Sequence, residues 1–200
     1  MEFNPARTIK ITALLLLLAV ITQVGYTVMY VAEMNPPKQF FWGLETLLFT
    51  ILSAFATAAM VQAKRFQLGW AAIAASAVLN VVQVSIGLTL FIPFREAAAQ
   101  TETLQPLARA IVALSFVIYY AAKLLLGMAA VVFGMNSMKD GNKALGGLTA
   151  LLGALALVAN AILITFGRDG FLPSPVAGAS GVVATLLLAF CLMSLAREEK

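Results

Sequence analysis

Lys123 lies inside the segment VIYYAAKLLLGMAAVVFG, residues 117–134, which is otherwise apolar, aromatic or small. A lone charge at the middle of a bilayer costs at least about 2.5 kcal/mol on insertion scales, so such a lysine has to be paired, hydrated or neutral. Its stem reaches about 6 Å, whereas water is about 15 Å away from the bilayer midplane. Because charges within membrane spans commonly mark functional sites, Lys123 is the first candidate for chemistry.

Other polar side chains also interrupt apolar segments, and they are expected to face inward towards partners or cavity water. The candidate ligand-binding residues are Lys123, Asn80, Gln83, Tyr119, Glu45, Asn160 and Gln23. Counting residues from the outer segment ends places Lys123, Asn80 and Gln83 near the middle of the bilayer. Glu45, Asn160 and Gln23 are expected nearer its outer face. We expect water or the amide of Gln83 or Asn160 to bridge Lys123 and Glu45.

Histidine is absent and cysteine occurs once, at Cys191. Histidine-ligated haem or metal and Ser-His or Cys-His nucleophiles are therefore excluded. A desolvated lysine can act as a base towards a serine, which leaves a serine–lysine mechanism open. However, Ser115 is about 12 Å along the same helical face from Lys123, too far for a hydrogen bond. We therefore expect no cofactor and no metal, and favour a protein that is not an enzyme.

The composition is that of a chain that resides in a bilayer. Its 200 residues are 62% hydrophobic and 11% charged, compared with about 25% charged in soluble domains. Stretches long enough to span a membrane occupy about 9–31, 40–63, 68–93, 109–135, 144–166 and 176–195. The first is too long for a signal-peptide core and is interpreted as a helix. The predicted fold is an all-α integral membrane protein, a single six-transmembrane-helix bundle over residues 1–200.

The basic residues predict the orientation of this bundle. Eight lie on the side of both termini: Arg7, Lys10, Lys64, Arg65, Lys139, Lys143, Arg197 and Lys200. Four lie on the other side: Lys38, Arg95, Arg109 and Arg168. This excess predicts cytoplasmic termini in a bacterial-type inner membrane. The net charge of +4 is then a topology signal, so we expect the lipid bilayer as a partner and no nucleic acid.

A weak internal repeat suggests three repeated helical hairpins. Segments 11–37 and 148–174 align without gaps and pair Gln23 with Asn160, while Asn80 holds a similar place in the third apolar segment. The stretch 95–108 is expected to be the longest connection, outside the membrane, with a short surface helix as one interpretation of its alanine run.

Small and polar residues recur at helical spacing on the fourth segment: Ser115, Tyr119, Lys123, Gly127, Ala130 and Gly134. The third and fifth segments carry comparable stripes. One interpretation is an outward-facing polar pocket, formed mainly by these three segments, that binds or translocates a small polar or amphiphilic solute, of which an anionic one is a particular case. The alternative is a non-catalytic structural or regulatory subunit, in which the same stripes pack helices tightly and dock a protein partner or a second copy of the chain.

Overall fold

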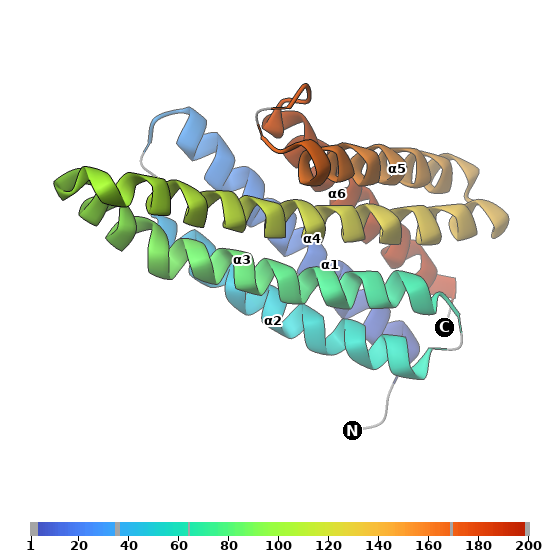
Figure 1. Cartoon of the computed structure of the whole chain (residues 1–200). Helices are drawn as coiled ribbons and strands as arrows, with labels where there is room; N and C mark the ends of the chain where they lie inside the picture. Colours follow the sequence, from blue (N-terminus) through green and yellow to red (C-terminus); the bar gives the residue numbers. More distant parts are fainter. Residues whose placement is uncertain (1–3, 35–36, 64, 169, 199–200) are drawn as a thin grey trace.

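The computed structural model describes residues 4–34, 37–63, 65–168 and 170–198. These residues form six long helices and a short 3₁₀ turn (Figure 1). The helices are α1 (Pro5–Val31), α2 (Lys38–Gln62), α3 (Gln67–Gln100), α4 (Gln105–Lys139), α5 (Lys143–Phe166) and α6 (Ser174–Glu198), with η1 (Glu102–Leu104) before α4. All six are long and apolar enough to cross a membrane, so the prediction of six apolar helices is confirmed.

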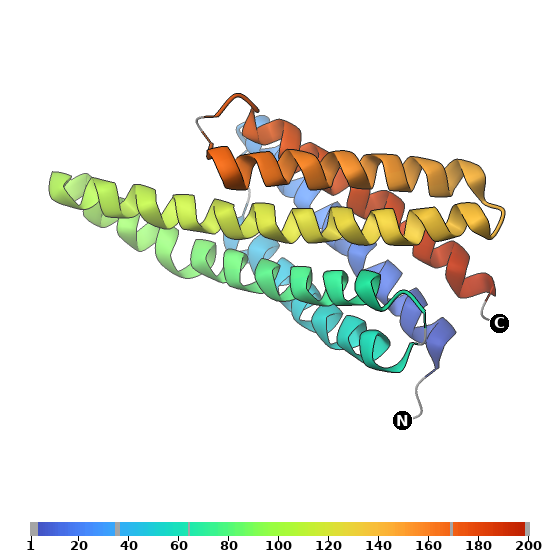
Figure 2. The same cartoon turned by 45° about the vertical axis from the view of Figure 1, so that its right-hand side comes forward.

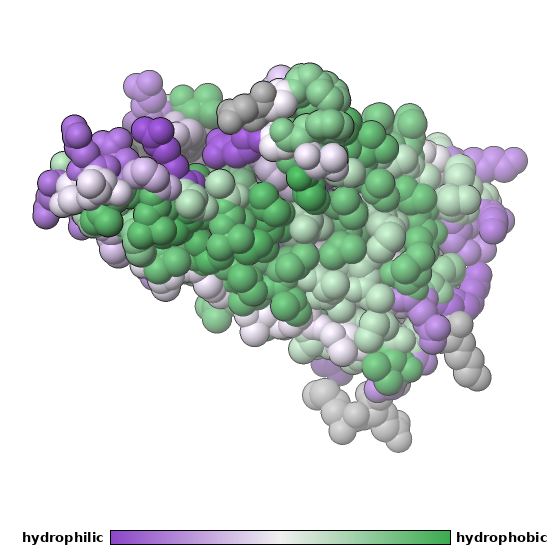
Figure 3. Space-filling view, viewed as in Figure 1, coloured by the Kyte–Doolittle hydropathy of each residue, from purple (hydrophilic) through white to green (hydrophobic). Residues whose placement is uncertain are grey.

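The helices form a closed ring in which each one packs against its neighbours in the chain and α6 returns to α1. α4 also contacts α6. Both termini lie at one end with the α2–α3 and α4–α5 connections, and we call this the terminal end (Figures 1 and 2). The opposite end, with the other three connections, is the far end. Hydrophobic residues cover the middle of the face seen in Figure 3, and hydrophilic residues gather towards its two ends.

α3 and α4 are longer than the sequence predicted, and the predicted connection 95–108 is wrong. α3 continues through Pro93 to Gln100, and α4 begins at Gln105, so only Thr101 and η1 separate them. A proline removes one backbone donor but does not always end a helix, which explains the misplaced boundary. At 1.5 Å per residue each helix is about 50 Å long, beyond the roughly 30 Å of a hydrocarbon core. The α3–α4 hairpin accordingly projects past the other helices at the far end (Figures 1 and 2).

Glycines bring α4 and α5 into backbone contact. A Cβ at Gly127 would lie 2.7 Å from the Gly153 carbonyl oxygen, and one at Gly134 would lie 2.6 Å from the Ala150 nitrogen. Close approach of this kind is the usual basis of helix association in lipid, where apolar burial gives little driving force. The small residues of the α4 stripe that lie towards the terminal end therefore allow α4 and α5 to pack closely.

The apolar core fills the terminal half of the bundle. Its largest fully buried members are Trp70, Phe49, Leu16, Leu52, Ile73, Leu126, Leu188 and Leu192. Phe133 packs edge-on against Trp70 at 5.0 Å between ring centroids. The second core cluster, around Tyr120, Leu163 and Ala177, is much smaller and lies in the far half. The far half of the interior is thus left to polar side chains and to a cavity.

Candidate functional site

Lys123 crosses the interior of the ring. Its side chain is 0% exposed, and its Nζ donates a hydrogen bond of 2.7 Å to Oε1 of Gln23 on α1. α1 and α4 are not adjacent helices, so this bond links opposite sides of the bundle. The ammonium also lies 5.4 Å from the ring centroid of Tyr119, within the range of a cation–π interaction. The buried charge therefore has an amide and an aromatic face as partners.

Glu45 on α2 is the other buried ionisable side chain of this region. It is 7% exposed, and its carboxylate is close enough to interact electrostatically with Lys123. Gly181 of α6 closes the other side, because a Cβ there would lie 2.8 Å from Cδ of Lys123. We call Lys123, Gln23, Tyr119 and Glu45 the Lys123 cluster.

The composition of this cluster differs from the expected arrangement of two levels. Gln23, assigned to the outer level, is the amide that meets Lys123, whereas Gln83 and Asn160 were expected to provide the bridge. The cluster also draws on α1, α2 and α4 rather than on α3, α4 and α5. Depth counted along single helices did not reveal this, because a long lysine side chain bridges residues at different depths on opposite helices.

Asn80 and Gln83 belong to the α3–α4 interface. Gln83 Nε2 donates to the Ser115 hydroxyl at 3.2 Å, and that hydroxyl donates to the Gln83 carbonyl at 3.4 Å. Asn80 Nδ2 donates to the Ser76 carbonyl at 2.9 Å, and the Ser76 hydroxyl donates to the Ala122 carbonyl at 2.8 Å. Ser76 and Gln83 therefore tie α3 to α4, whereas the hydrogen bonds of Asn80 stay within α3, and none of these bonds reaches Lys123.

Asn160 makes a similar link between α5 and α6. Its Nδ2 donates to the Ala156 carbonyl at 2.8 Å and to the Ala177 carbonyl at 3.4 Å. The Oδ1 atoms of Asn160 and Asn80 are buried and have no protein partner among the described residues. Of the seven candidate residues, four form the Lys123 cluster and three act at separate helix interfaces.

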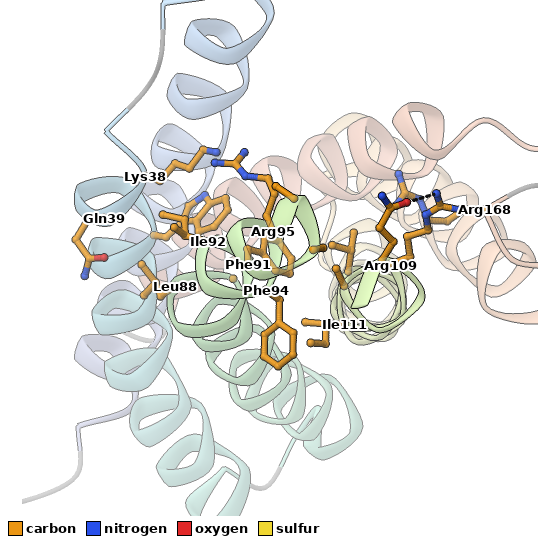
Figure 4. A pocket seen from close by; sticks show the side chains of 17 residues that line it. Lys38, Gln39, Leu88, Phe91, Ile92, Phe94, Arg95, Arg109, Ile111 and Arg168 are labelled. Atoms are coloured by element: carbon orange, nitrogen blue, oxygen red, sulfur yellow. Dashed lines mark hydrogen bonds between the residues drawn. The ribbon is translucent and has the colours of Figure 1, made fainter. Parts of the chain in front are cut away.

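A large cavity lies at the far end, away from the tight packing around Lys123. It has a volume of about 710 Å³, within the range typical of small-molecule sites. Its walls come from the start of α2, the last third of α3, the start of α4 and the α5–α6 connection (Figure 4). We call it the far-end cavity.

Four basic side chains line the far-end cavity: Lys38, Arg95, Arg109 and Arg168. They are the same four that the sequence assigned to the outer side. Figure 4 places Lys38 and Arg95 on one side of the cavity and Arg109 and Arg168 on the other. Within the described part of the chain no carboxylate lines the cavity, and Asp169 lies outside the described residues. The lining is therefore strongly cationic.

Acidic residues are present at the same end but are kept out of the cavity wall. Glu33, Glu96 and Glu102 all belong to the far end, are exposed, and are not part of the lining. The far end as a whole is thus close to electrically balanced, whereas the cavity concentrates its positive charges. This segregation is a property of the fold, because residue counts on that side of the bundle cannot reveal it.

The floor between the charges is apolar. Leu88, Phe91, Ile92 and Phe94 from α3 and Ile111 from α4 are part of it (Figure 4).

Trp42 forms the inner wall of the cavity. It packs so closely on α3 that a Cβ at Gly87 would lie 2.8 Å from its Cζ3. Its ring centroid is 6.0 Å from that of Phe91 and 5.4 Å from that of Tyr26. Trp42 therefore stands between the cavity and α1.

The same faces of α3 and α4 continue from the cavity towards the Lys123 cluster. Gly87 of the lining is one turn from Gln83, and Val112 is about one turn from Ser115. The Gln83–Ser115 pair is thus the next polar feature below the cavity on both helices, and Lys123 follows two turns further along α4.

The site has a definite chemical character that is not visible in the sequence. Cationic groups beside an apolar floor suit a molecule with an anionic head and an apolar body. In the sequence, Lys38, Arg95, Arg109 and Arg168 indicate only topology, and their position near the outer ends of predicted segments is the one signal that they could form a cluster. Across the described residues no three His, Cys, Asp or Glu side chains gather as metal ligands.

The chain matches no protein-family model, no curated protein and no solved structure.

Proposed function

We propose that this protein is a multi-pass membrane protein that binds, and in a further step translocates, a small amphiphilic anion, and that the far-end cavity is where the anion enters. The observation that carries the proposal is the lining of this cavity of about 710 Å³, with four basic side chains around an apolar floor. A polar solute without an apolar part would leave that floor in contact with water, and a neutral one would leave the cations without a partner.

The proposed membrane placement makes the cavity outward-facing. The six apolar helices cross a bacterial-type inner membrane, and the terminal end, with the larger number of basic residues, lies in the cytoplasm. The far-end cavity then opens at the outer surface, at the level where lipid head groups and amphiphiles concentrate. In the same proposal the chain consists of three hairpins that close outward, and the hairpin repeat remains a hypothesis about their origin.

The Lys123 cluster is the proposed second binding site for the anionic group, deeper in the bundle than the far-end cavity. In the present packing Gln23 occupies the ammonium and Gly181 abuts its stem, so the cluster is closed. An anion that passed Trp42 would replace the Gln23 amide as the partner of Lys123, with Tyr119 and Glu45 beside it. Asn80, Gln83 and Asn160 would supply hydrogen bonds along the way, and the buried Oδ1 atoms of both asparagines provide acceptors for a hydroxyl-bearing solute.

A structural or regulatory subunit is the second candidate. The specific observation in its favour is that Gln83, Asn160 and Lys123 all have partners within the chain, as expected of side chains that hold helices together. In that case the four cations at the far end interact with bulk lipid head groups and have no ligand of their own.

Mass spectrometry of the molecules that co-purify with the chain in mild detergent separates the two candidates. Wild type is compared with Arg95→Gln/Arg109→Gln, and the matched control is Arg197→Gln at the terminal end. We expect a compound that is retained by wild type and the control and is lost from the double variant. If all three proteins carry the same bulk lipids at equal stability, the binding proposal fails and the structural role is favoured.

A further inference from the structure

The charge of the far-end cavity is larger than a singly charged ligand would balance. Lys38, Arg95, Arg109 and Arg168 face it, and none has a carboxylate partner among the described residues. A monoanion in contact with one pair of cations would leave the other pair, whose arginines are exposed, to water alone. A head group with two negative charges could be shared between Lys38 and Arg95 on one side and Arg109 and Arg168 on the other (Figure 4).

The arginines favour an oxyanion. The guanidinium presents a planar fork of donors that matches phosphate geometry, which lysine cannot do. Arg168 is held with its guanidinium carbon 4.0 Å above the centroid of the Phe116 ring, so its donor edge is positioned without an ion pair. Arg109 has only a long hydrogen bond of 3.5 Å to Gln105 within its own helix turn. Both guanidinium groups therefore keep donors available for a ligand.

The start of α2 adds to the positive potential. α2 begins at the cavity with Lys38 and has neither a side-chain cap nor an acidic residue in its first turn. The backbone N–H groups and the positive dipole end there favour anions. The carboxyl end of α3 lies at the same end of the bundle and opposes this effect, so the four side chains provide most of the charge.

The size and floor of the cavity require an apolar tail beside the head group. Phe91, Phe94 and Ile111 offer far more apolar surface than a free inorganic anion would contact. A volume of about 710 Å³ suits a drug-sized molecule, so it would accommodate the head group and the first part of a tail, with the rest of the tail in the bilayer.

We infer that the ligand of the far-end cavity is a lipid phosphate, in which a phosphate monoester with two negative charges is carried on an apolar chain. This inference rests on the proposed function and specifies its head group. The phosphate is shared between the Lys38–Arg95 and Arg109–Arg168 pairs, and the chain lies on the floor formed by Phe91, Phe94 and Ile111.

Native mass spectrometry of the detergent-purified full chain tests this with three lipids of identical acyl chains. Phosphatidic acid carries a phosphate monoester, phosphatidylglycerol a singly charged diester, and phosphatidylcholine a net neutral head group. We expect one saturable phosphatidic acid adduct at about pH 8, with an affinity about tenfold above that of phosphatidylglycerol, corresponding to one additional charge-assisted contact. Inorganic phosphate should not displace it, because it lacks the tail.

The pH dependence reports the charge of the head group. The second pKa of a phosphate monoester is about 6, so lowering the pH from about 8 to about 5.5 removes most of its second charge. The preference for phosphatidic acid should therefore shrink at low pH, while binding of phosphatidylglycerol stays unchanged. Arg95→Gln/Arg109→Gln should abolish the preference, and Arg197→Gln should retain it.

The outcomes separate this inference from the proposed function. Equal affinity for phosphatidic acid and phosphatidylglycerol, or a preference that does not change with pH, overturns the doubly charged head group but leaves anionic amphiphile binding intact. Displacement by inorganic phosphate overturns the inference that binding requires an apolar tail. Equal binding of phosphatidylcholine, or no saturable adduct with any of the lipids, overturns the proposed function as well. If the double variant is unstable, Arg95→Lys replaces it, because it keeps the charge, removes the fork, and should weaken only phosphatidic acid.

Discussion

Lys123 and Glu45 are both buried, and their energetic coupling is the first quantity to measure. Lys123→Met keeps the side-chain volume but leaves a buried carboxylate without its cation and the Gln23 oxygen without its donor. We expect a loss of about 1–3 kcal/mol in stability, of which Lys123→Met/Glu45→Gln recovers a part. Thermal unfolding of the purified single and double variants gives the coupling from a double-mutant cycle.

The exposed Lys139→Met serves as the control for this cycle and should leave the unfolding midpoint unchanged. A stabilising Lys123→Met variant, with effects that add to those of Glu45→Gln, would contradict the coupling. It would also mean that Lys123 reduces stability in the closed cluster.

Two glycines on α6 provide a matched test of how tightly the Lys123 stem is enclosed. A Cβ at Gly181 would lie 2.8 Å from Lys123 Cδ and 3.0 Å from its Cβ and Cγ, whereas one at Gly178 would meet only the Tyr119 hydroxyl at 3.5 Å. Alanine gains up to about 1 kcal/mol of helix propensity over glycine, but overpacking costs about 1–3 kcal/mol. We expect Gly178→Ala to be neutral or stabilising and Gly181→Ala to be destabilising in thermal unfolding. Similar midpoints for both would show that the stem moves freely.

The α4–α5 pair is the most tightly joined pair of helices in the bundle, because their backbones touch at glycines. Gly134→Ala would place a methyl group 2.6 Å from the Ala150 nitrogen, and rigid backbone cannot move aside as a flexible side chain can. We expect a loss of more than about 2 kcal/mol and a reduced yield of monodisperse protein in size-exclusion chromatography. Gly43→Ala on α2 is the control, since no atom lies within 4 Å of the position that its methyl group would take. Equal yields for the two variants would exclude backbone contact.

The helices themselves could be predicted from the sequence, because about twenty consecutive apolar residues leave few alternatives. The limits of α3 and α4 could not, since both helices extend beyond the predicted spans, and α3 continues through Pro93 and the alanines after it. Polarity alone identified Lys123 and Gln23 as candidates. Their pairing depends on the order of the helices around the ring. That order cannot be inferred from the sequence, because the six apolar stretches have similar compositions.

The two halves of the molecule differ in what fills their interior. The terminal half holds a continuous apolar core, whereas the far half holds the Lys123 cluster and, beyond it, the far-end cavity. Most of the buried apolar residues are thus packed towards the terminal end. Any movement that opens the cluster to the cavity should therefore involve the far halves of α1, α2 and α4 and leave the terminal half in place.

The orientation of the whole bundle decides which compartment would supply the proposed ligand, and cysteine labelling can determine this orientation. In a Cys191→Ala background, Glu102→Cys places a thiol at the exposed far end and Asp140→Cys places one at the exposed terminal end. The excess of basic residues at the terminal end predicts that a membrane-impermeant maleimide labels Glu102→Cys on intact cells of a bacterial host. Asp140→Cys should react only after permeabilisation. The reverse pattern would place the cavity in the cytoplasm, and the ligand would then have to come from the inner leaflet or the cell interior.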